Sequence, residues 1–298
     1  MAKTSYRDEI AKNKLSSIIL VIIVSLILFF LIYFIIIFLI PELLLIALPL
    51  SAFFILLYTY SSYRFGDSVV LSTTNAKPAQ AREYQYLLDT VEGLSIASAV
   101  SPPKAYVIES EDLNAFATGR NPENASIAVT TGLVRSLNRQ ELEGVISHEI
   151  AHIKNRDILF MTLVAVLVGL AAIVSHLILR SLWFGAQRDR RDRGGIMIVL
   201  LIIGIILAIF APIATRLVQY AVSRKREYLA DASGAGLTRY PEGLASALEK
   251  IASKNQGRIN VSEAVSHLFF VDPKKSSLDS LFATHPPINE RIKRLREM

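Results

Sequence analysis

The sequence predicts a mainly α-helical membrane protein of the α+β class, with two transmembrane helical hairpins and one extramembrane domain formed from two sequence blocks. Three observations support this fold class: four long apolar runs, basic residues beside these runs, and short strand patterns in the polar sequence between them. Hydrophobic residues make up 52% of the 298 positions, and the mean hydropathy is +0.41. Both values are high for a soluble protein of this length, and the excess lies in the four runs.

Each apolar run is about as long as a transmembrane helix. The runs contain 23, 18, 22 and 20 residues, at 18–40, 43–60, 158–179 and 196–215. A bilayer core about 30 Å thick needs roughly 20 apolar residues in a helix. Helices buried in a soluble core are the alternative, but they are shorter and usually keep a polar stripe. The first run is also longer than the apolar part of a cleavable signal peptide, which has about 7–15 residues.

The runs divide the chain into four parts. Residues 1–62 form the first predicted transmembrane hairpin, and residues 158–222 form the second. The polar blocks 63–157 and 223–298 together are large enough for one folded domain. We therefore expect these two blocks to fold together at the membrane surface.

Basic residues predict the orientation in the membrane. Four of them precede the first run: Lys3, Arg7, Lys12 and Lys14. The turn at Pro41-Glu42 has none, so the positive-inside rule places both polar blocks in the cytoplasm and predicts a multi-pass plasma-membrane protein. Four arginines at 188–193 oppose this orientation but are outnumbered. The basic residues lie at membrane edges without interleaved aromatic residues, so nucleic-acid binding is not expected.

The chain contains no cysteine. This excludes disulfides, thiolate metal ligands and a cysteine nucleophile. Any chemistry must therefore come from histidines, carboxylates or hydroxyls.

Local patterns predict the secondary structure of the two polar blocks. Strands are expected at 104–108, 114–118 and 126–130, with turn chemistry at 120–124. Helices are expected at 77–93, 139–155, 241–253 and 289–297. Asn138 is placed to cap the helix at 139–155, with Glu141 at the third helical position.

The helix at 139–155 carries the pattern His-Glu-x-x-His. His148 and His152 are four residues apart, so they lie on one face, one turn from each other. This spacing lets two imidazole nitrogens reach one Zn²⁺. Glu149, next to the first ligand, is then placed to act as a general base. The pattern also arises by chance in roughly one chain in a hundred of this length, and its position on an amphipathic helix favours the zinc interpretation.

A catalytic zinc needs a third protein ligand and leaves the fourth position to water. Glu227 is the candidate for this ligand. Asp231 lies four residues later on the same expected helical face, where it could hold a ligand histidine by its other nitrogen. The loop at Asp189-Arg190 lies midway between His152 and Glu227. An antiparallel second hairpin with equal arms would therefore bring Glu227 level with His152.

These motifs resemble those of the HtpX-type membrane zinc metalloproteases, relatives of the CAAX prenyl proteases among the gluzincins. The matching segments are His148–His152, Arg224–Asp231 and Thr284–Pro287. The resemblance implies a zincin-like catalytic domain, one Zn²⁺ per chain held by His148, His152 and Glu227, and Glu149 as general base. It also implies a membrane-embedded endopeptidase in quality control, with misfolded membrane polypeptides as substrates.

Two further segments carry weaker signals. Asn114, Ala115 and Phe116 resemble the family's edge strand, where an extended substrate could add as another strand, although an ordinary hairpin explains them as well. His285 could stabilise the transition state, or it could brace the last helix. We interpret His176 as structural and assign no role to His267.

Three other functions remain as alternatives. A transporter would need ionisable residues within several spans, and these are nearly absent. A zinc-binding adaptor without activity would not need Glu149. A CAAX prenyl protease would need a chamber for a lipidated peptide, which four spans are few to enclose.

Overall fold

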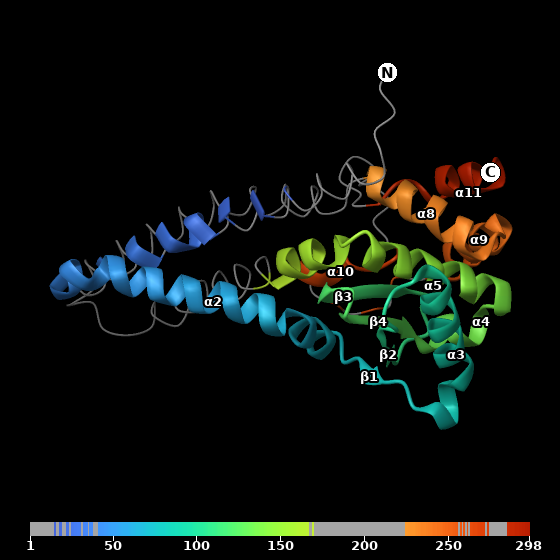
Figure 1. Ribbon diagram of the computed structural model, residues 1–298, viewed down its shortest axis with the longest axis horizontal. Coiled ribbons are helices and arrows are strands. Elements are labelled where there is room, and N and C mark those ends of the chain that lie inside the picture. Colours follow the sequence, from blue (N-terminus) through green and yellow to red (C-terminus); the bar gives the residue numbers. More distant parts are fainter. Residues whose placement is uncertain are drawn as a thin grey trace, which may run out of the picture.

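The computed structural model describes residues 41–166, 224–255 and 285–298 continuously, together with parts of 15–37 and 257–273 and residue 169. A long helix extends away from a body in which helices surround a small sheet (Figure 1). This agrees with the predicted mainly helical α+β class. The two transmembrane hairpins stay a prediction, because the run at 196–215 and most of the run at 158–179 lie outside the described residues.

The long helix is α2, Leu44–Thr73, which follows the short 3₁₀ helix η1, Pro41–Leu43. Of the described helices, only α2 is long and apolar enough to cross a membrane. Only 17% of its most apolar window is buried, so it is not a core helix. The described residues of 15–37 are helical as well. One contact joins them to α2, because the hydroxyls of Ser25 and Thr59 lie 3.2 Å apart.

Helix α2 continues beyond Tyr60, where the predicted span ends, into the folded body. Near its end, Val70 and Leu71 are buried in one cluster with Ile108 and Phe116 of the sheet. The apolar helix and the domain are therefore one continuous element at this point. Arg64 and Asp67 lie within this helix and do not end it.

Four strands form the sheet: β1 (Lys77–Pro78), β2 (Lys104–Ile108), β3 (Ala115–Asn121) and β4 (Asn124–Thr130). Their order is β1-β2-β4-β3, with β2 and β4 parallel and the other pairs antiparallel. The three predicted strands are confirmed. The hairpin between β3 and β4 is tighter than predicted, because both strands extend into 120–124. Strand β3 lies at the edge of the sheet.

Two elements differ from their predicted bounds near the start of the domain. Helix α3 spans Ala81–Ser98 and not 77–93. Lys77 and Pro78 pair with β2 instead, and a proline disfavours helical conformation in the residue before it. The short helix α4 (Thr131–Ser136) was not predicted; the side chain of Thr130 caps it by accepting from the Leu133 N–H.

Helix α5 (Arg139–Lys154) forms the centre of the body. Its predicted capping box is confirmed: the Asn138 side chain accepts from the Glu141 N–H, and Glu141 accepts from the Asn138 N–H. One side of α5 faces α3 and β3. The other side packs on α8 (Arg224–Thr238) and α9 (Pro241–Lys254) (Figure 1).

The last described elements complete the core around α5. They are the short helix α10 (Glu263–Ser266) and the C-terminal helix α11 (Ile288–Arg296). Helix α11 packs on α9 and α8, which places the end of the chain beside the centre of the domain. The two polar blocks thus fold together around α5.

Candidate metal centre

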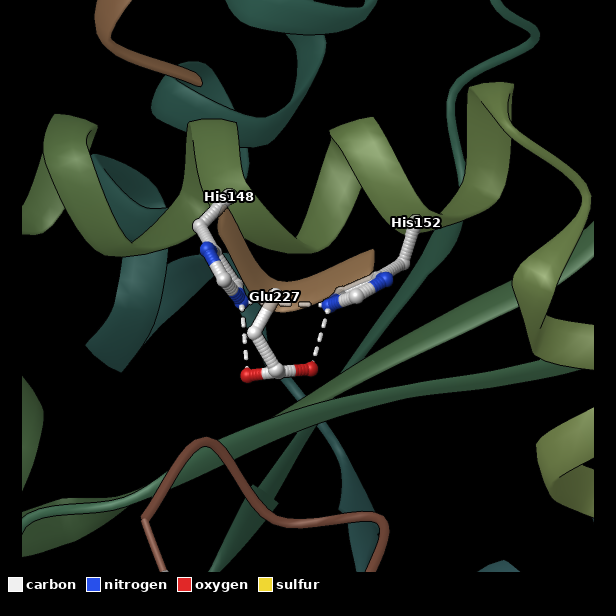
Figure 2. Close-up of side chains that lie close together, drawn as sticks. All are labelled: His148, His152 and Glu227. Carbon is white, nitrogen blue, oxygen red and sulfur yellow. Dashed lines mark hydrogen bonds and ion pairs between the residues drawn. The ribbon is translucent and has the colours of Figure 1, made fainter. Parts of the chain in front are cut away.

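The side chains of two histidines on α5 bring their Nε2 atoms close together. His148 and His152 lie one helical turn apart, and both are buried. Their Nε2 atoms are 3.1 Å apart (Figure 2). Burial of two imidazoles so close together is unfavourable unless their nitrogens share a ligand or a proton.

The carboxylate of Glu227, on α8, faces the two imidazoles (Figure 2). Its oxygens lie 3.5 Å from the Nε2 of His152 and 3.9 Å from the Nε2 of His148. One ligand atom from each of the three residues falls within 4.8 Å of the others. Ligands bound to one zinc at about 2.0–2.1 Å in tetrahedral geometry lie roughly 3.3 Å apart. The three side chains therefore fit one zinc ion.

A carboxylate holds the second nitrogen of each histidine. The Nδ1 of His148 lies 2.9 Å from Asp231, and the Nδ1 of His152 lies 3.2 Å from Asp157. A carboxylate on Nδ1 keeps the proton there and leaves the Nε2 lone pair for a metal. The structure brings Asp231 to its predicted place. The sequence prediction missed Asp157, although its position five residues after His152 was a usable signal.

Arg291 is a second buried residue that sequence reasoning missed. Its side chain is 0% exposed, and it donates to both carboxylate oxygens of Asp231, at 2.7 and 2.9 Å. It also lies 3.8 Å from Glu227. A fully buried arginine is rare unless paired, so its charge balances the carboxylates of the site. Its place in α11, six residues after His285, was the available signal.

Glu149 lies beside the three candidate ligands and is not one of them. It is 2% exposed, and the backbone N–H of Ala117 in β3 hydrogen-bonds to it. Burial raises its pKa to about 7, and the charge of Glu227 adds to this effect. A carboxyl group with a pKa near neutrality can both accept and release a proton, as a general base requires.

The protonation of the two histidines differs because their neighbours differ. Burial lowers the pKa of His148 to about 4, although Asp231 opposes the change. Burial also disfavours charge on His152, but Asp157 and Glu227 outweigh it and raise its pKa. Burial of Glu227 is likewise outweighed, by His285 and His152, which lower the pKa of this carboxyl group well below its usual range. Glu227 is therefore anionic and His148 neutral, and a metal ion would displace the proton that His152 carries.

Comparison with known proteins identifies the family. A model of peptidase family M48 matches residues 81–298. The chain belongs to peptidase family M48. It is therefore a peptidase, and the predicted relation to HtpX-type proteases is confirmed.

Three relatives show how much of the chain is shared. Each is a protease HtpX homolog, and together they come from two bacteria and an archaeon. The homolog of Thermoanaerobacter pseudethanolicus is 48% identical over 253 residues, which are 84% of each chain. The Pyrococcus furiosus homolog is 47% identical over 251 residues, 83% of this chain and 85% of its own. The Streptococcus gordonii homolog is 41% identical over 247 residues, which are 82% of this chain and 83% of its own.

Solved structures were compared as well. The crystal structure of S. mikatae Ste24p matches with a TM-score of 0.48 and 21% sequence identity. The match covers 82% of this chain and 57% of the other, so the chain spans little more than half of that protein's length.

His285 lies at the candidate metal centre, three residues before α11 begins. Its Nδ1 is 3.0 Å from a carboxylate oxygen of Glu227. Its Nε2 is buried and has no hydrogen-bond partner among the described residues. The residue before α11 is Pro287, which makes no side-chain cap, and His285 bonds to Glu227 instead. The proposed role in the transition state stays a prediction.

The remaining predicted residues have different surroundings. Asn114, Ala115 and Phe116 are buried where β3 begins, on the edge strand beside Glu149. The Nε2 of His267 lies 3.2 Å from the carbonyl of Met161, which gives this histidine a structural contact. His176 lies outside the described residues.

Proposed function

We propose that this peptidase is a zinc-dependent endopeptidase embedded in the plasma membrane, with its catalytic domain in the cytoplasm. The observation that carries the proposal is the buried group of His148, His152 and Glu227. Both imidazoles turn Nε2 toward Glu227, and both have Nδ1 held by a carboxylate. The chain offers no thiolate, so this set of two nitrogens and one oxygen suits a catalytic zinc.

Zinc, when bound, supplies Lewis-acid polarisation of the peptide carbonyl and of water. Glu149 takes a proton from the attacking water at its carboxylate and passes it to the nitrogen of the leaving amine. In the metal-free protein its pKa is raised to about 7, which suits a group that accepts and releases a proton. His285 faces Glu227 with its Nδ1. Its Nε2 has no partner among the described residues and could donate to the oxyanion that forms when water attacks the peptide carbonyl.

The substrates that we propose are misfolded or damaged membrane polypeptides, as expected for protein quality control. Helix α2 supports this proposal, because it runs from an apolar, exposed section directly into the catalytic domain. Helix α2 contacts β3, the strand whose Ala117 N–H hydrogen-bonds to Glu149. A polypeptide leaving the bilayer would meet the site without a long transfer through water.

The proposal is tested with purified protein and an unfolded model polypeptide in detergent. We expect the wild type to cleave it with zinc, to lose activity with a chelator and to regain it when zinc is restored. Glu149→Gln should abolish cleavage while one zinc per chain remains, because Glu149 is not a ligand. Glu143→Gln, on the outer face of α5, is the matched control and should stay active. Cleavage by Glu149→Gln, or zinc loss in it, would contradict the assigned role.

A further inference from the structure

The outer edge of β3 is occupied by another part of the same chain. The carbonyl of Asn114 accepts from the Thr130 N–H of β4, so the next carbonyl, that of Ala115, points to the open edge of the sheet. It accepts a hydrogen bond of 2.7 Å from the N–H of Phe270. Phe270 therefore occupies a backbone acceptor that an added strand would use.

The side chain of Asn114 extends this pairing by one residue. Its Oδ1 accepts from the N–H of Val271 at 3.1 Å, and its Nδ2 donates to the carbonyl of Val271 at 2.7 Å. One buried amide thus satisfies both backbone groups of a single residue. This contact recognises a polypeptide backbone and requires no particular side chain.

The other side of Phe270 faces the metal centre. Its carbonyl accepts from Arg291 at 3.2 Å, and the guanidinium lies 4.6 Å from the centre of its ring. The same ring lies edge-on to the imidazole of His148, with 4.8 Å between ring centres. Two consecutive residues of the chain, bound to Ala115 and Asn114, therefore lie directly beside a candidate metal ligand.

These contacts have the two properties of a polypeptide-binding site. Main-chain hydrogen bonds to an edge strand provide affinity for any sequence, and a pocket for a side chain provides selectivity. The pocket is the space between His148 and Arg291 that the Phe270 ring fills. Apolar and aromatic rings suit it, because a guanidinium face and an imidazole edge both pack well on an aromatic ring.

We propose that Phe270 and Val271 occupy the substrate site of this peptidase, and that an extended polypeptide with an aromatic or large aliphatic residue binds there by displacing them. The inference rests on the proposed peptide hydrolysis and names its substrate class. It accounts for the burial of Glu149 and the three candidate ligands, all of which are 4% exposed or less. It also explains how Asn114 and Ala115 can bind substrate although both are buried.

The first test measures amide hydrogen exchange in the zinc-loaded Glu149→Gln protein, which binds substrate without cleaving it. The probe is a synthetic peptide with the sequence of residues 267–273, His-Leu-Phe-Phe-Val-Asp-Pro. A saturating amount should accelerate exchange at Phe270 and Val271 by roughly tenfold or more, because peptide and segment compete for one site. Exchange at Val129 in β4 should not change.

The control peptide carries serine in place of its second phenylalanine and should bind more weakly, because it leaves the ring pocket empty. Failure of both peptides to bind overturns the proposal. So does binding with unchanged or slower exchange at Phe270 and Val271, since the segment would then be a permanent wall of the site.

The second test loosens the segment without altering the site. Val271→Pro removes the N–H that donates to Asn114 and leaves β3 and Arg291 intact. Losing one hydrogen bond of about 1 kcal/mol should lower KM for an unfolded polypeptide about fivefold, with little change in kcat. Val271→Ala keeps the N–H and is the matched control, with KM near the wild-type value.

The outcomes separate this inference from the function on which it rests. Zinc-dependent hydrolysis with an unchanged KM in Val271→Pro contradicts the inference alone. Absence of hydrolysis in the wild type and every variant contradicts the proposed function. If no variant hydrolyses peptides, peptide binding to Glu149→Gln with faster exchange at Phe270 and Val271 would still show that these two residues occupy a polypeptide-binding site.

Discussion

The guanidinium of Arg291 donates two hydrogen bonds to Asp231, with Nε 2.9 Å from Oδ2 and Nη2 2.7 Å from Oδ1. Asp231 in turn lies 2.9 Å from the Nδ1 of His148. A chain of contacts thus runs from the C-terminal helix α11 to the candidate metal. Burial disfavours a charged Asp231, but Arg291 outweighs this effect and lowers the pKa of the carboxyl group to about 2. The pair is therefore ionised at physiological pH.

Arg291→Met should destabilise the protein and weaken zinc binding. Removing one partner of a buried ion pair costs about 3–5 kcal/mol, because the other charge stays buried and unpaired. A looser Asp231 should lower zinc affinity roughly 10–100-fold. Denaturant unfolding and competitive zinc titration measure the two effects.

Two variants serve as controls for Arg291→Met. Arg294 lies on the exposed face of α11 and pairs with Glu290 at the surface. Arg294→Met should therefore change the free energy of unfolding by less than about 1 kcal/mol. The double variant Arg291→Met with Asp231→Asn should recover part of the stability, because it removes both charges. An Arg291→Met protein as stable as Arg294→Met would show that the buried pair is not needed.

Gly234 sets the distance between α8 and α5. A Cβ at this position would lie 2.9 Å from the backbone nitrogen of His148. Backbone atoms cannot move aside as a flexible side chain would, so Gly234→Ala should push the helices apart. Because His148 and Glu227 sit on these two helices, we expect weaker zinc binding, measured by competitive titration.

Gly236, two residues later in α8, is the matched control. A Cβ there meets no atom within 4 Å. Gly236→Ala should leave zinc affinity unchanged and stabilise the helix by up to about 1 kcal/mol, because alanine is the better helix former. Equal zinc affinities in both variants would contradict the claim that helix spacing fixes the site.

The pH dependence of stability should report the burial of Glu149 in the metal-free protein. Its pKa is raised from 4.5 to about 7. The buried carboxyl group makes its full contribution to the free energy of unfolding below pH 4.5, where it is protonated. This contribution is lost as the pH rises through 7. Glutamine resembles the protonated form at every pH. Glu149→Gln should therefore match the wild type at pH 4.5 and exceed it by at most about 3 kcal/mol at pH 8.5.

Denaturant unfolding at these two pH values measures the difference. Glu143→Gln is the control, because Glu143 lies on the same helix and forms a surface ion pair with Arg139. Its stability should differ from the wild type by less than about 1 kcal/mol at both values. A Glu149→Gln protein that is no more stable than the wild type at pH 8.5 would contradict the raised pKa.

The sequence predicted the parts of the site that depend on local spacing. The four-residue interval puts His148 and His152 on one face wherever the segment is helical, and the cap at Asn138 signalled that helix. Glu227 was predicted because it lies as far after Asp189-Arg190 in the sequence as His152 lies before it. The structure brings all three together, as the geometry above shows.

Contacts that depend on tertiary packing could not be read from the chain. Asp157 and Arg291 have only their positions near His152 and His285 as signals in the sequence, and only the fold shows that they contact His152 and Asp231. Strand β1 has two residues and exists only because β2 lies beside it. The docking of Phe270 on Ala115 joins residues far apart in the chain and has no local signature.

Zinc affinity of the Glu227→Ala variant tests the central claim most directly. Competitive titration should show one tightly bound zinc in the wild type and a loss of more than about 100-fold in Glu227→Ala, beyond the effect typical of groups that only support a ligand. Glu242→Ala, on exposed α9 surface, should bind as the wild type does. Full zinc affinity in Glu227→Ala would contradict the account, because a group other than Glu227 would then complete the site.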